Sequence, residues 1–281
     1  MSDPYVLPNG TLRNRFGVTD QAELEAQESR AVSARQTLLD AHPYSGSFDF
    51  AFLCRIHRLL FQDVFDWAGE PRTVSLAKQD FEGPEGQIIG FTPARLIDRE
   101  ATQLFASMPS VEDLAAKTPD EFASSIGMFL VGLNNLHPFR EGNGRTQRLF
   151  TRHLGRRAGF DVAWDVVTRE RMVAASVQGA IGDREPMRRL LLEIIDPERV
   201  RALRKALDFL KRSQSVPWND LYVATTVAGQ VYRGILVGRS APDFMMRAEG
   251  ADNEWIAVGH ADDIPEDAVS GEPLSFISRR W

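Results

Sequence analysis

Residues 137–148 read His137-Pro138-Phe139-Arg140-Glu141-Gly142-Asn143-Gly144-Arg145-Thr146-Gln147-Arg148. Pro138 stops the apolar helix that ends near Leu136. The two glycines let the backbone turn tightly and approach a ligand closely. A helix is expected to resume at about Arg145, so that free backbone N–H groups lie at its N-terminus. Such a helix start is a ready site for an anion.

Arginine is concentrated in and after this run. Arg145 and Arg148 lie three residues apart, on one face of the first turn of the expected helix. Cations at a helix N-terminus oppose the helix dipole, at a cost of up to about 1 kcal/mol each, so the pattern predicts a compensating anion. A polyphosphate would supply it, because the guanidinium fork matches phosphate oxygens.

Two further side chains bring chemistry to the loop. Glu141 is its only acid. It either pairs with a neighbouring arginine or holds Mg²⁺, which takes one or two carboxylates together with substrate phosphates. His137 stands at the start of the loop, where an imidazole with an ordinary pKa of about 6.5 acts as a general base. The sequence contains no G-x-G-x-x-G fingerprint after a strand, and no G-x-x-x-x-G-K-[ST], H-E-x-x-H or G-x-S-x-G motif.

The run resembles the Fic-domain signature H-x-F-x-[DE]-G-N-G-R-x-x-R, and every fixed position of the signature is filled. The resemblance extends to residues 5–36, 67–73 and 183–187. The chain is similar in particular to toxins and type IV secretion effectors of alphaproteobacteria, in which an OB-like domain follows the Fic domain. For the C-terminal part, the resemblance depends mainly on the order and size of the elements.

This resemblance implies a protein adenylyltransferase. His137 would take the proton of a hydroxyl on a target protein, and that oxygen would attack the α-phosphate of ATP while pyrophosphate leaves. Glu141 would hold Mg²⁺, and Arg148 would bind the γ-phosphate. The other implied phosphate-binding residues are Gly142, Asn143, Gly144 and Arg145. Phosphoryl-type transfer depends mainly on positioning and charge stabilisation, which such a loop supplies.

A short β-rich segment, residues 72–91, interrupts the helical region. Thr73-Val74 and Ile88-Ile89 flank a centre rich in glycine and acid, which predicts a hairpin. By resemblance this hairpin is a flap that binds the target protein by β-augmentation; an ordinary surface hairpin is the alternative. The residues expected to dock the target are Arg72, Thr73, Val74, Ser75, Leu76 and Lys78.

Fic proteins are often held inactive by a helix with the pattern [ST]-x-x-x-E-[GN], whose glutamate pairs with the second arginine of the motif. This sequence lacks the pattern; its nearest match, Thr19 to Glu23, continues with Leu24. The resemblance therefore implies a small antitoxin that supplies the helix in trans, with its glutamate facing Arg148.

No motif identifies the target protein. Similar toxins modify the ATPase subunits of type II topoisomerases. The sequence ends at Trp281 without a basic secretion domain, which favours a toxin inside the bacterium. The first alternative is an effector that a type IV secretion system delivers to modify a host protein. Others are a Doc-type kinase, which Gly144-Arg145 disfavours, phosphocholine transfer, and a non-catalytic nucleotide-binding module.

The composition of the 281 residues is that of a globular protein. Apolar residues make up 43%, charged residues 26%, and the net charge is −6, which disfavours direct binding of nucleic acid. No apolar run is long enough for a membrane span and no signal peptide is visible. Cys54 is the single cysteine, which excludes an internal disulfide and fits a reducing cytoplasm. The other histidines, His57 among them, match no metal-binding spacing and are expected to be structural.

Sequence periodicity divides the chain into two parts. Residues 1–212 are expected to form a mainly α Fic-type helical bundle with the flap at about 72–91. Residues 213–281 are expected to form a small all-β, OB-like barrel. Predicted helices cover 23–39, 48–65, 93–108, 118–134, 145–158, 168–179, 186–195 and 197–212. Predicted strands cover 222–227, 230–237, 244–247, 255–258 and 274–277.

Overall fold

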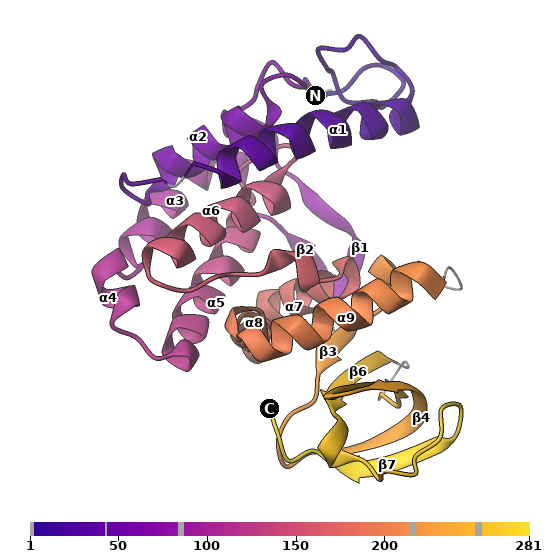
Figure 1. Ribbon diagram of the computed structural model, residues 1–281. Coiled ribbons are helices and arrows are strands. Elements are labelled where there is room, and N and C mark those ends of the chain that lie inside the picture. Colours follow the sequence, from indigo (N-terminus) through magenta and orange to yellow (C-terminus); the bar gives the residue numbers. More distant parts are fainter. Residues whose placement is uncertain (1–2, 43, 84–86, 214–216, 251–254) are drawn as a thin grey trace. The chain divides into compact units, whose positions relative to one another are not determined.

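Helices and one hairpin form the first part of the chain, and helices followed by a sheet form the second (Figure 1). The structure is a computed structural model that describes residues 3–42, 44–83, 87–213, 217–250 and 255–281. Its contacts separate two units. The N-terminal unit comprises residues 1–162 and 180–182, and the C-terminal unit comprises residues 163–179 and 183–281.

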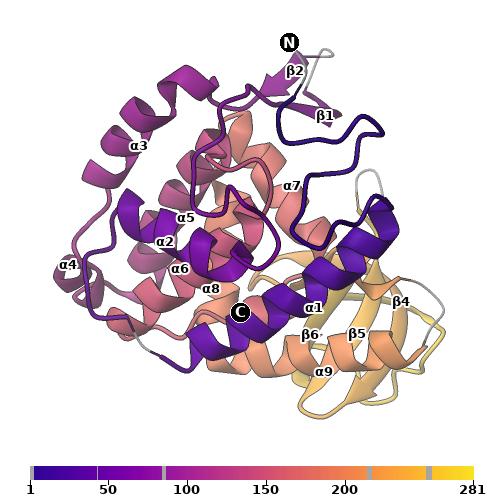
Figure 2. The same ribbon diagram turned by 90° about the horizontal axis from the view of Figure 1, so that it is seen from above.

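The described helices of the N-terminal unit are α1 (Gln21–Asp40), α2 (Phe50–Phe61), α3 (Ile97–Ala106), α4 (Val111–Ala115), α5 (Pro119–Leu136) and α6 (Asn143–Arg157). Helix α2 packs against α1 and α6, and α5 packs against α3 and α6 (Figure 2). Asp20 and Asp49 cap the first two helices by accepting backbone N–H groups, and Thr118 begins α5 with a capping box. These contacts surround α6, which carries Arg145 and Arg148 of the motif.

Aromatic side chains form the core beneath α6. The buried ring of Phe150 contacts the rings of Phe48, Phe52, Phe105 and Phe129, with centroid separations of 5.6 to 5.8 Å. Each aromatic pair adds about 0.5–1.5 kcal/mol beyond the burial of its area. The apolar face of α6 is therefore fixed, and its polar face is available for the site.

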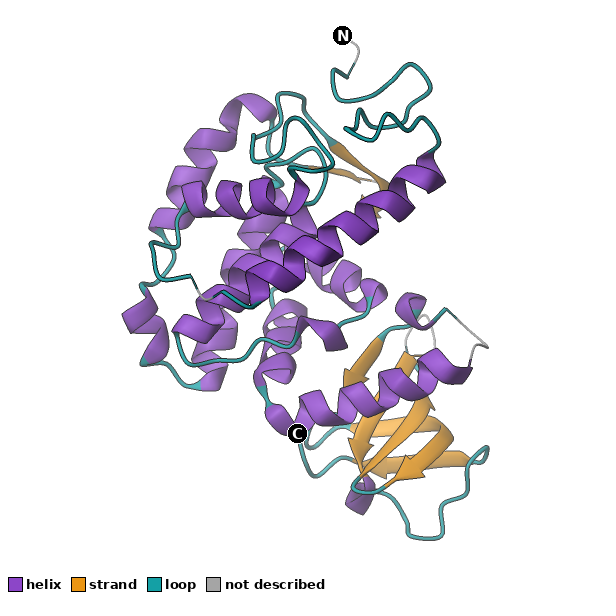
Figure 3. Ribbon diagram, turned by 45° about the horizontal axis from the view of Figure 1, so that its top comes forward, coloured by secondary structure: helices purple, strands orange, loops and turns teal. Residues whose placement is uncertain are grey.

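The expected hairpin is present. Strand β1 (Ala77–Gly83) pairs antiparallel with β2 (Gln87–Gly90), with Ala77 opposite Gly90 and Gly83 opposite Gln87. Figure 3 shows this hairpin as a small β element beside the helices of its unit. Residues 72–76 and 91–92 are the two legs that connect it to the helices, and we refer to legs and strands together as the flap.

The C-terminal unit begins with α7 (Arg169–Ala180), α8 (Glu185–Ile195) and α9 (Pro197–Ser213). The strands that follow are β3 (Val223–Thr225), β4 (Val231–Ser240), β5 (Asp243–Ala248), β6 (Trp255–His260) and β7 (Pro273–Ile277). Their order in the sheet is β3-β6-β5-β4-β7; β3 and β6 are parallel and the other pairs are antiparallel. Helix α9 packs against β3 and β6.

All five predicted strands are confirmed, but the expected barrel is not closed. Strands β3 and β7 stand at the two ends of the strand order, and no ladder joins them within the described residues. Tyr232, Leu236, Phe244, Met246 and Phe276 belong to the buried apolar core of this sheet. The arrangement remains compatible with the predicted OB-like class.

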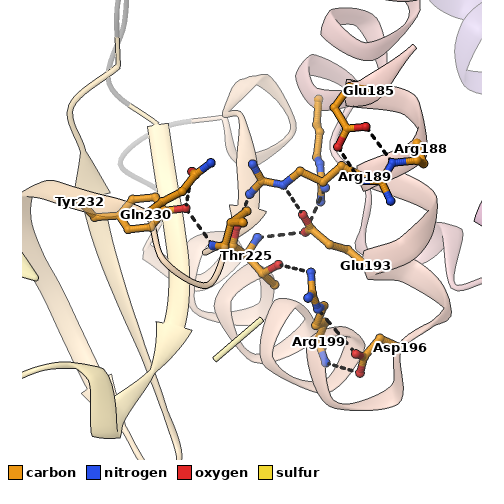
Figure 4. A network of polar contacts seen from close by, with 11 residues as sticks. Glu185, Arg188, Arg189, Glu193, Asp196, Arg199, Thr225, Gln230 and Tyr232 are labelled. Atoms are coloured by element: carbon orange, nitrogen blue, oxygen red, sulfur yellow. Dashed lines mark hydrogen bonds and ion pairs between the residues drawn. The ribbon is translucent and has the colours of Figure 1, made fainter. Parts of the chain in front are cut away.

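A buried ionic network joins helices α7, α8 and α9 to the sheet in the C-terminal unit. The carboxylate of Glu193 on α8 is fully buried, 2.9 Å from Arg171 Nη2 and 3.0 Å from Arg189 Nε. The backbone N–H of Thr225 on β3 donates to the same carboxylate at 2.9 Å. Arg199 donates to the Thr225 hydroxyl and pairs with Asp196 (Figure 4). Burial acts to raise the pKa of Glu193, but the guanidinium groups outweigh it and hold that pKa below its ordinary value.

The predicted helices are present, with differences at their ends; α3, for example, begins at Ile97, four residues after the predicted start at residue 93. Helix α2 ends at Phe61 instead of residue 65, and α6 begins at Asn143, two residues before the expected Arg145. Helix α4 was not predicted, because its five residues are too short for a periodic signal. Among the described helices, none combines the length and apolarity needed to cross a bilayer. The contact units divide near residue 162, and the domain boundary expected at 212 stays a prediction.

Candidate active site

The motif loop starts where α5 ends. His137 is the C-cap of α5 and adopts a left-handed backbone conformation, with φ 43° and ψ 62°. Its N–H donates to the Leu133 carbonyl at 3.0 Å, and its ring stacks on Phe91 with ring centroids 3.8 Å apart. Because a left-handed conformation is uncommon for a residue with a Cβ, the surrounding contacts must maintain it.

The loop closes on itself before α6 begins. The side-chain oxygen of Asn143 accepts from the Phe139 N–H at 2.9 Å, and its amide nitrogen donates to the Phe139 carbonyl at 2.8 Å. Gly142 has φ +82°, and a Cβ at this position would lie 2.4 Å from the Phe61 ring. The expected binding of phosphate by Asn143 stays a prediction; both polar atoms of its side-chain amide have partners within the loop. Its contribution is to fix the loop that presents the first N–H groups of α6.

Carboxylates from the first 40 residues pair with two of the three motif arginines and with Arg152, which follows the motif on α6. Arg140 pairs with Asp3 at 2.9 Å, and Arg152 pairs with Asp40 at 2.6 Å. Arg145 Nη2 pairs with Glu28 on α1 and lies 3.2 Å from Glu141. Arg145 therefore has carboxylate partners within the protein, and its expected contact with phosphate stays a prediction.

Arg148 is the exception among these arginines. In the portion of the chain that the structure describes, no carboxylate pairs with its guanidinium group, and its position six residues into α6 places it in the second helical turn. Burial, together with the positive charges of Arg145 and Arg152, lowers the pKa of Arg148 to about 10. An uncompensated cation in this position favours a bound anion.

Glu141 has the properties of a ligand for Mg²⁺. Its side chain is 45% exposed, and its one ion-pair partner among the described residues is Arg145. No group of three His, Cys, Asp or Glu side chains forms a metal cage in the described ranges. This donor set fits a metal that one carboxylate holds and whose remaining ligands are substrate phosphates and water. It does not fit a metal that needs several protein ligands.

His57 is buried against the motif loop and holds it in place, which is a structural role of the kind expected. Its buried ring accepts the Gly69 N–H at Nδ1, 2.7 Å away, so Nε2 carries the proton that it donates to the Glu141 carbonyl at 3.0 Å. The ring stacks on Phe139 with centroids 3.9 Å apart. Burial lowers the pKa of His57 to about 4, so the imidazole is neutral at physiological pH.

The predicted docking residues occupy different positions in the flap. Thr73 and Ser75 are exposed, and Val74 and Leu76 are partly exposed. Arg72 is only 2% exposed, and its guanidinium donates to backbone carbonyls instead of facing a target protein. A direct docking role for Arg72 is therefore inconsistent with its position. The side chain of Lys78 lies outside the described residues.

Two residues of the site were not found from the sequence. Glu28 is 117 residues from Arg145 and belongs to no motif, so only the packing of α1 near α6 brings them together. Burial raises the pKa of Glu28, and the charge of Arg145 acts in the opposite direction. Phe91 lies at the end of the flap and reaches His137 only after the chain folds. No local sequence signal marks either contact.

Comparisons with known proteins agree with this site. A family model described as the Fic/DOC family matches residues 47–154. The protein adenylyltransferase of Bartonella henselae is 32% identical over 98% of this chain and 52% of its own length, so the chain spans about half of that relative. The "Probable protein adenylyltransferase y4lH" of Sinorhizobium fredii is 37% identical over 66% of this chain and 93% of its own length.

Solved structures show the same fold. The type IV secretion system effector protein BepA is 30% identical, with a TM-score of 0.87 over 99% of this chain and 96% of its own. A Fic domain from Bartonella quintana with bound ADP is also 30% identical, with a TM-score of 0.61 over 70% of this chain and 97% of its own. From the filled motif, the geometry of its loop and these similarities, we conclude that the chain belongs to the Fic/DOC family.

Proposed function

We propose that this chain is a protein adenylyltransferase that moves AMP from ATP to a hydroxyl side chain of a target protein. The observation that carries the proposal is Arg148, a cation without a carboxylate partner in the described residues, next to the loop that holds His137 and Glu141. The relatives named protein adenylyltransferase and the ADP bound to a similar Fic domain support ATP as the substrate.

In this proposal His137 takes the proton as the target hydroxyl oxygen forms a bond to the α-phosphorus of ATP. The bond between the α-phosphorus and the bridging oxygen breaks, and pyrophosphate leaves with the electron pair. Arg148 binds the γ-phosphate, and the N–H groups at the start of α6 bind the remaining oxygens. Glu141 would hold Mg²⁺, which neutralises phosphate charge when it is bound.

The position of the transferred label tests this reaction. The full chain is incubated with a bacterial lysate and ATP labelled at either the α- or the γ-phosphate, beside the His137→Ala variant. A protein band that carries only the α label and is absent with the variant supports AMP transfer. A band with only the γ label would make the chain a kinase. No labelled band, with retained ATP binding, would leave a nucleotide-binding module.

Arg148→Leu is expected to weaken the binding of ATP about tenfold to a hundredfold, while ADP binding changes little. Charge-assisted hydrogen bonds contribute about 1.5–3 kcal/mol, and ADP lacks the γ-phosphate that Arg148 is proposed to contact. Titration calorimetry with both nucleotides measures the difference. The matched control is Arg157→Leu, at the last residue of the same helix. An equal loss for ATP and ADP would contradict the assignment of Arg148 to the γ-phosphate.

The proposed partner that restrains the enzyme is a small antitoxin. Its inhibitory helix would place a glutamate against Arg148 and so exclude the γ-phosphate. This part of the proposal draws on the absence of an [ST]-x-x-x-E-[GN] pattern from the sequence and on the missing carboxylate beside Arg148 in the described residues. It predicts that the protein expressed alone is active.

The target protein is proposed from similarity. Type II topoisomerase subunits are the first candidate, as for similar toxins, and the protein would then act in the cytoplasm. The similarity to BepA, named as a type IV secretion effector, favours a second candidate, which is a host protein reached by secretion. The size of the labelled band in bacterial and in eukaryotic lysates distinguishes the two.

A further inference from the structure

The guanidinium group of Arg72 is buried at the base of the flap. Only 2% of the residue is exposed, and no carboxylate pairs with it in the described part of the chain. Its hydrogen-bond acceptors are backbone carbonyls: Nε donates to His137 at 2.8 Å, Nη1 to Val74 at 2.7 Å, and Nη2 to Thr92 at 2.6 Å. Burying a cation costs free energy unless its N–H donors are hydrogen-bonded. A buried arginine at this position is therefore expected to have a specific structural role.

These carbonyls belong to three segments that meet at one point. Val74 is in the first leg of the flap, Thr92 is in the second leg, and His137 caps α5. The Leu136 carbonyl, 3.4 Å from Nη2, is a further acceptor at the end of α5. The last carbonyls of a helix lack helical partners and carry partial negative charge. Arg72 therefore satisfies the end of α5 and connects it to both legs of the flap.

Main-chain contacts strengthen this connection. The Arg72 N–H donates to the Pro138 carbonyl at 2.8 Å, and the Thr92 N–H donates to the Asn135 carbonyl at 2.9 Å. The first leg is thus attached just after His137 and the second leg just before it. A movement of either leg would shift the backbone of His137 and, with it, the imidazole.

The imidazole itself also touches the flap. Phe91 precedes Thr92, and its ring is stacked on His137 with an angle of 15° between the planes. The backbone of His137 is held by Arg72, and its ring is held by Phe91. The uncommon left-handed backbone of His137 is therefore bound from two sides by adjacent parts of the flap.

We propose that Arg72 and Phe91 are positioning residues that couple the flap to His137, so that a target strand docked on the flap fixes the direction of the imidazole. This inference rests on the proposed function, since it assigns a target to the flap and a base to His137. Lysine cannot replace Arg72 here, because a single ammonium group does not reproduce the planar fork that contacts all three segments.

The test combines kinetics with the NMR spectrum of the full chain. Arg72→Lys is expected to lower kcat for AMP transfer about tenfold to a hundredfold, with the KM for ATP unchanged. The ring resonance of His137, one of five histidines, is assigned by its absence in His137→Ala. We expect this resonance to move in Arg72→Lys toward its position in Phe91→Leu, as the stacking on Phe91 is lost.

Arg171→Lys is the matched control, because Arg171 is equally buried but contacts Glu193 in the C-terminal unit. It should leave kcat and the His137 resonance unchanged. An unmoved resonance in Arg72→Lys would overturn the proposal even if the protein transferred no AMP. A loss of activity that Arg171→Lys reproduces would indicate a stability effect only. If Arg72→Lys does not fold, kcat is measured for Phe91→Leu instead. An unchanged kcat in that variant would refute the coupling between the flap and His137.

Discussion

His137→Ala is expected to reduce kcat for AMP transfer by about two to four orders of magnitude. The target hydroxyl is a poor nucleophile until its proton is removed, and the imidazole at the start of the loop is the group assigned to that step. The phosphate-binding groups lie on the loop and on α6, where the mutation removes no contact. The KM for ATP should therefore stay near the wild-type value, and the loss should appear in kcat.

Steady-state kinetics with α-labelled ATP and a purified target measure both constants. His42→Ala is the control, since His42 is exposed and its ring contacts only the Leu38 carbonyl, one turn earlier, in the described chain. Retention of the wild-type kcat by His137→Ala would remove the imidazole from the reaction. A parallel rise in the KM for ATP would instead assign His137 to nucleotide binding.

Glu193→Ala is expected to lower the free energy of unfolding of the full chain by about 3–5 kcal/mol. The substitution leaves Arg171, itself 2% exposed at the side chain, buried without its counterion, and it removes the acceptor of the Thr225 N–H. Both losses occur where α7, α8 and β3 meet. Urea denaturation followed by circular dichroism measures the change.

The control for this prediction lies on the same helix. Glu185 pairs with Arg188 at the exposed start of α8, so Glu185→Ala should cost less than about 1 kcal/mol. The pKa of Glu193 lies below the ordinary value of 4.5, so its ion pairs stabilise the fold above about pH 4.5 and are lost as the pH falls through the lowered pKa. Glu193→Ala should consequently show a smaller acid-induced loss of stability than the wild type. Equal stability of Glu193→Ala and Glu185→Ala would show that the network is dispensable.

Local patterns predicted the elements that carry the motif. The apolar periodicity of 118–134 and the glycines at 142 and 144 placed a loop between two helices, and the alternation after residue 220 placed every strand of the sheet. These signals depend on neighbouring residues, and so a single sequence contains them. The closure of the barrel depends on which strands pair, and the spacing of the strands did not determine it.

The interaction partners of the charged residues in the site could not be predicted from local sequence patterns. Arginine is usually an exposed residue, so nothing in the sequence distinguished Arg72, which is buried against carbonyls, from the arginines on the surface. Glu28 is one of several acids in the segment that forms α1, and no pattern distinguishes it from the others. Its pairing with Arg145 depends on the way α1 packs, which is a property of the tertiary fold and not of any motif.

The carboxylates of Asp3, Glu28 and Asp40 act as internal counterions for the arginines of the loop and α6. A fragment trimmed to residues 47–154, the range of the family match, would keep the whole motif but lose all three. Arg140, Arg145 and Arg152 would then lack these counterions, although the 14 acids of the fragment still outnumber its 11 lysines and arginines. We expect this local patch to attract small polyanions such as inorganic triphosphate. Polyanion binding at this patch would report the missing carboxylates of Asp3, Glu28 and Asp40, not an activity of the native protein.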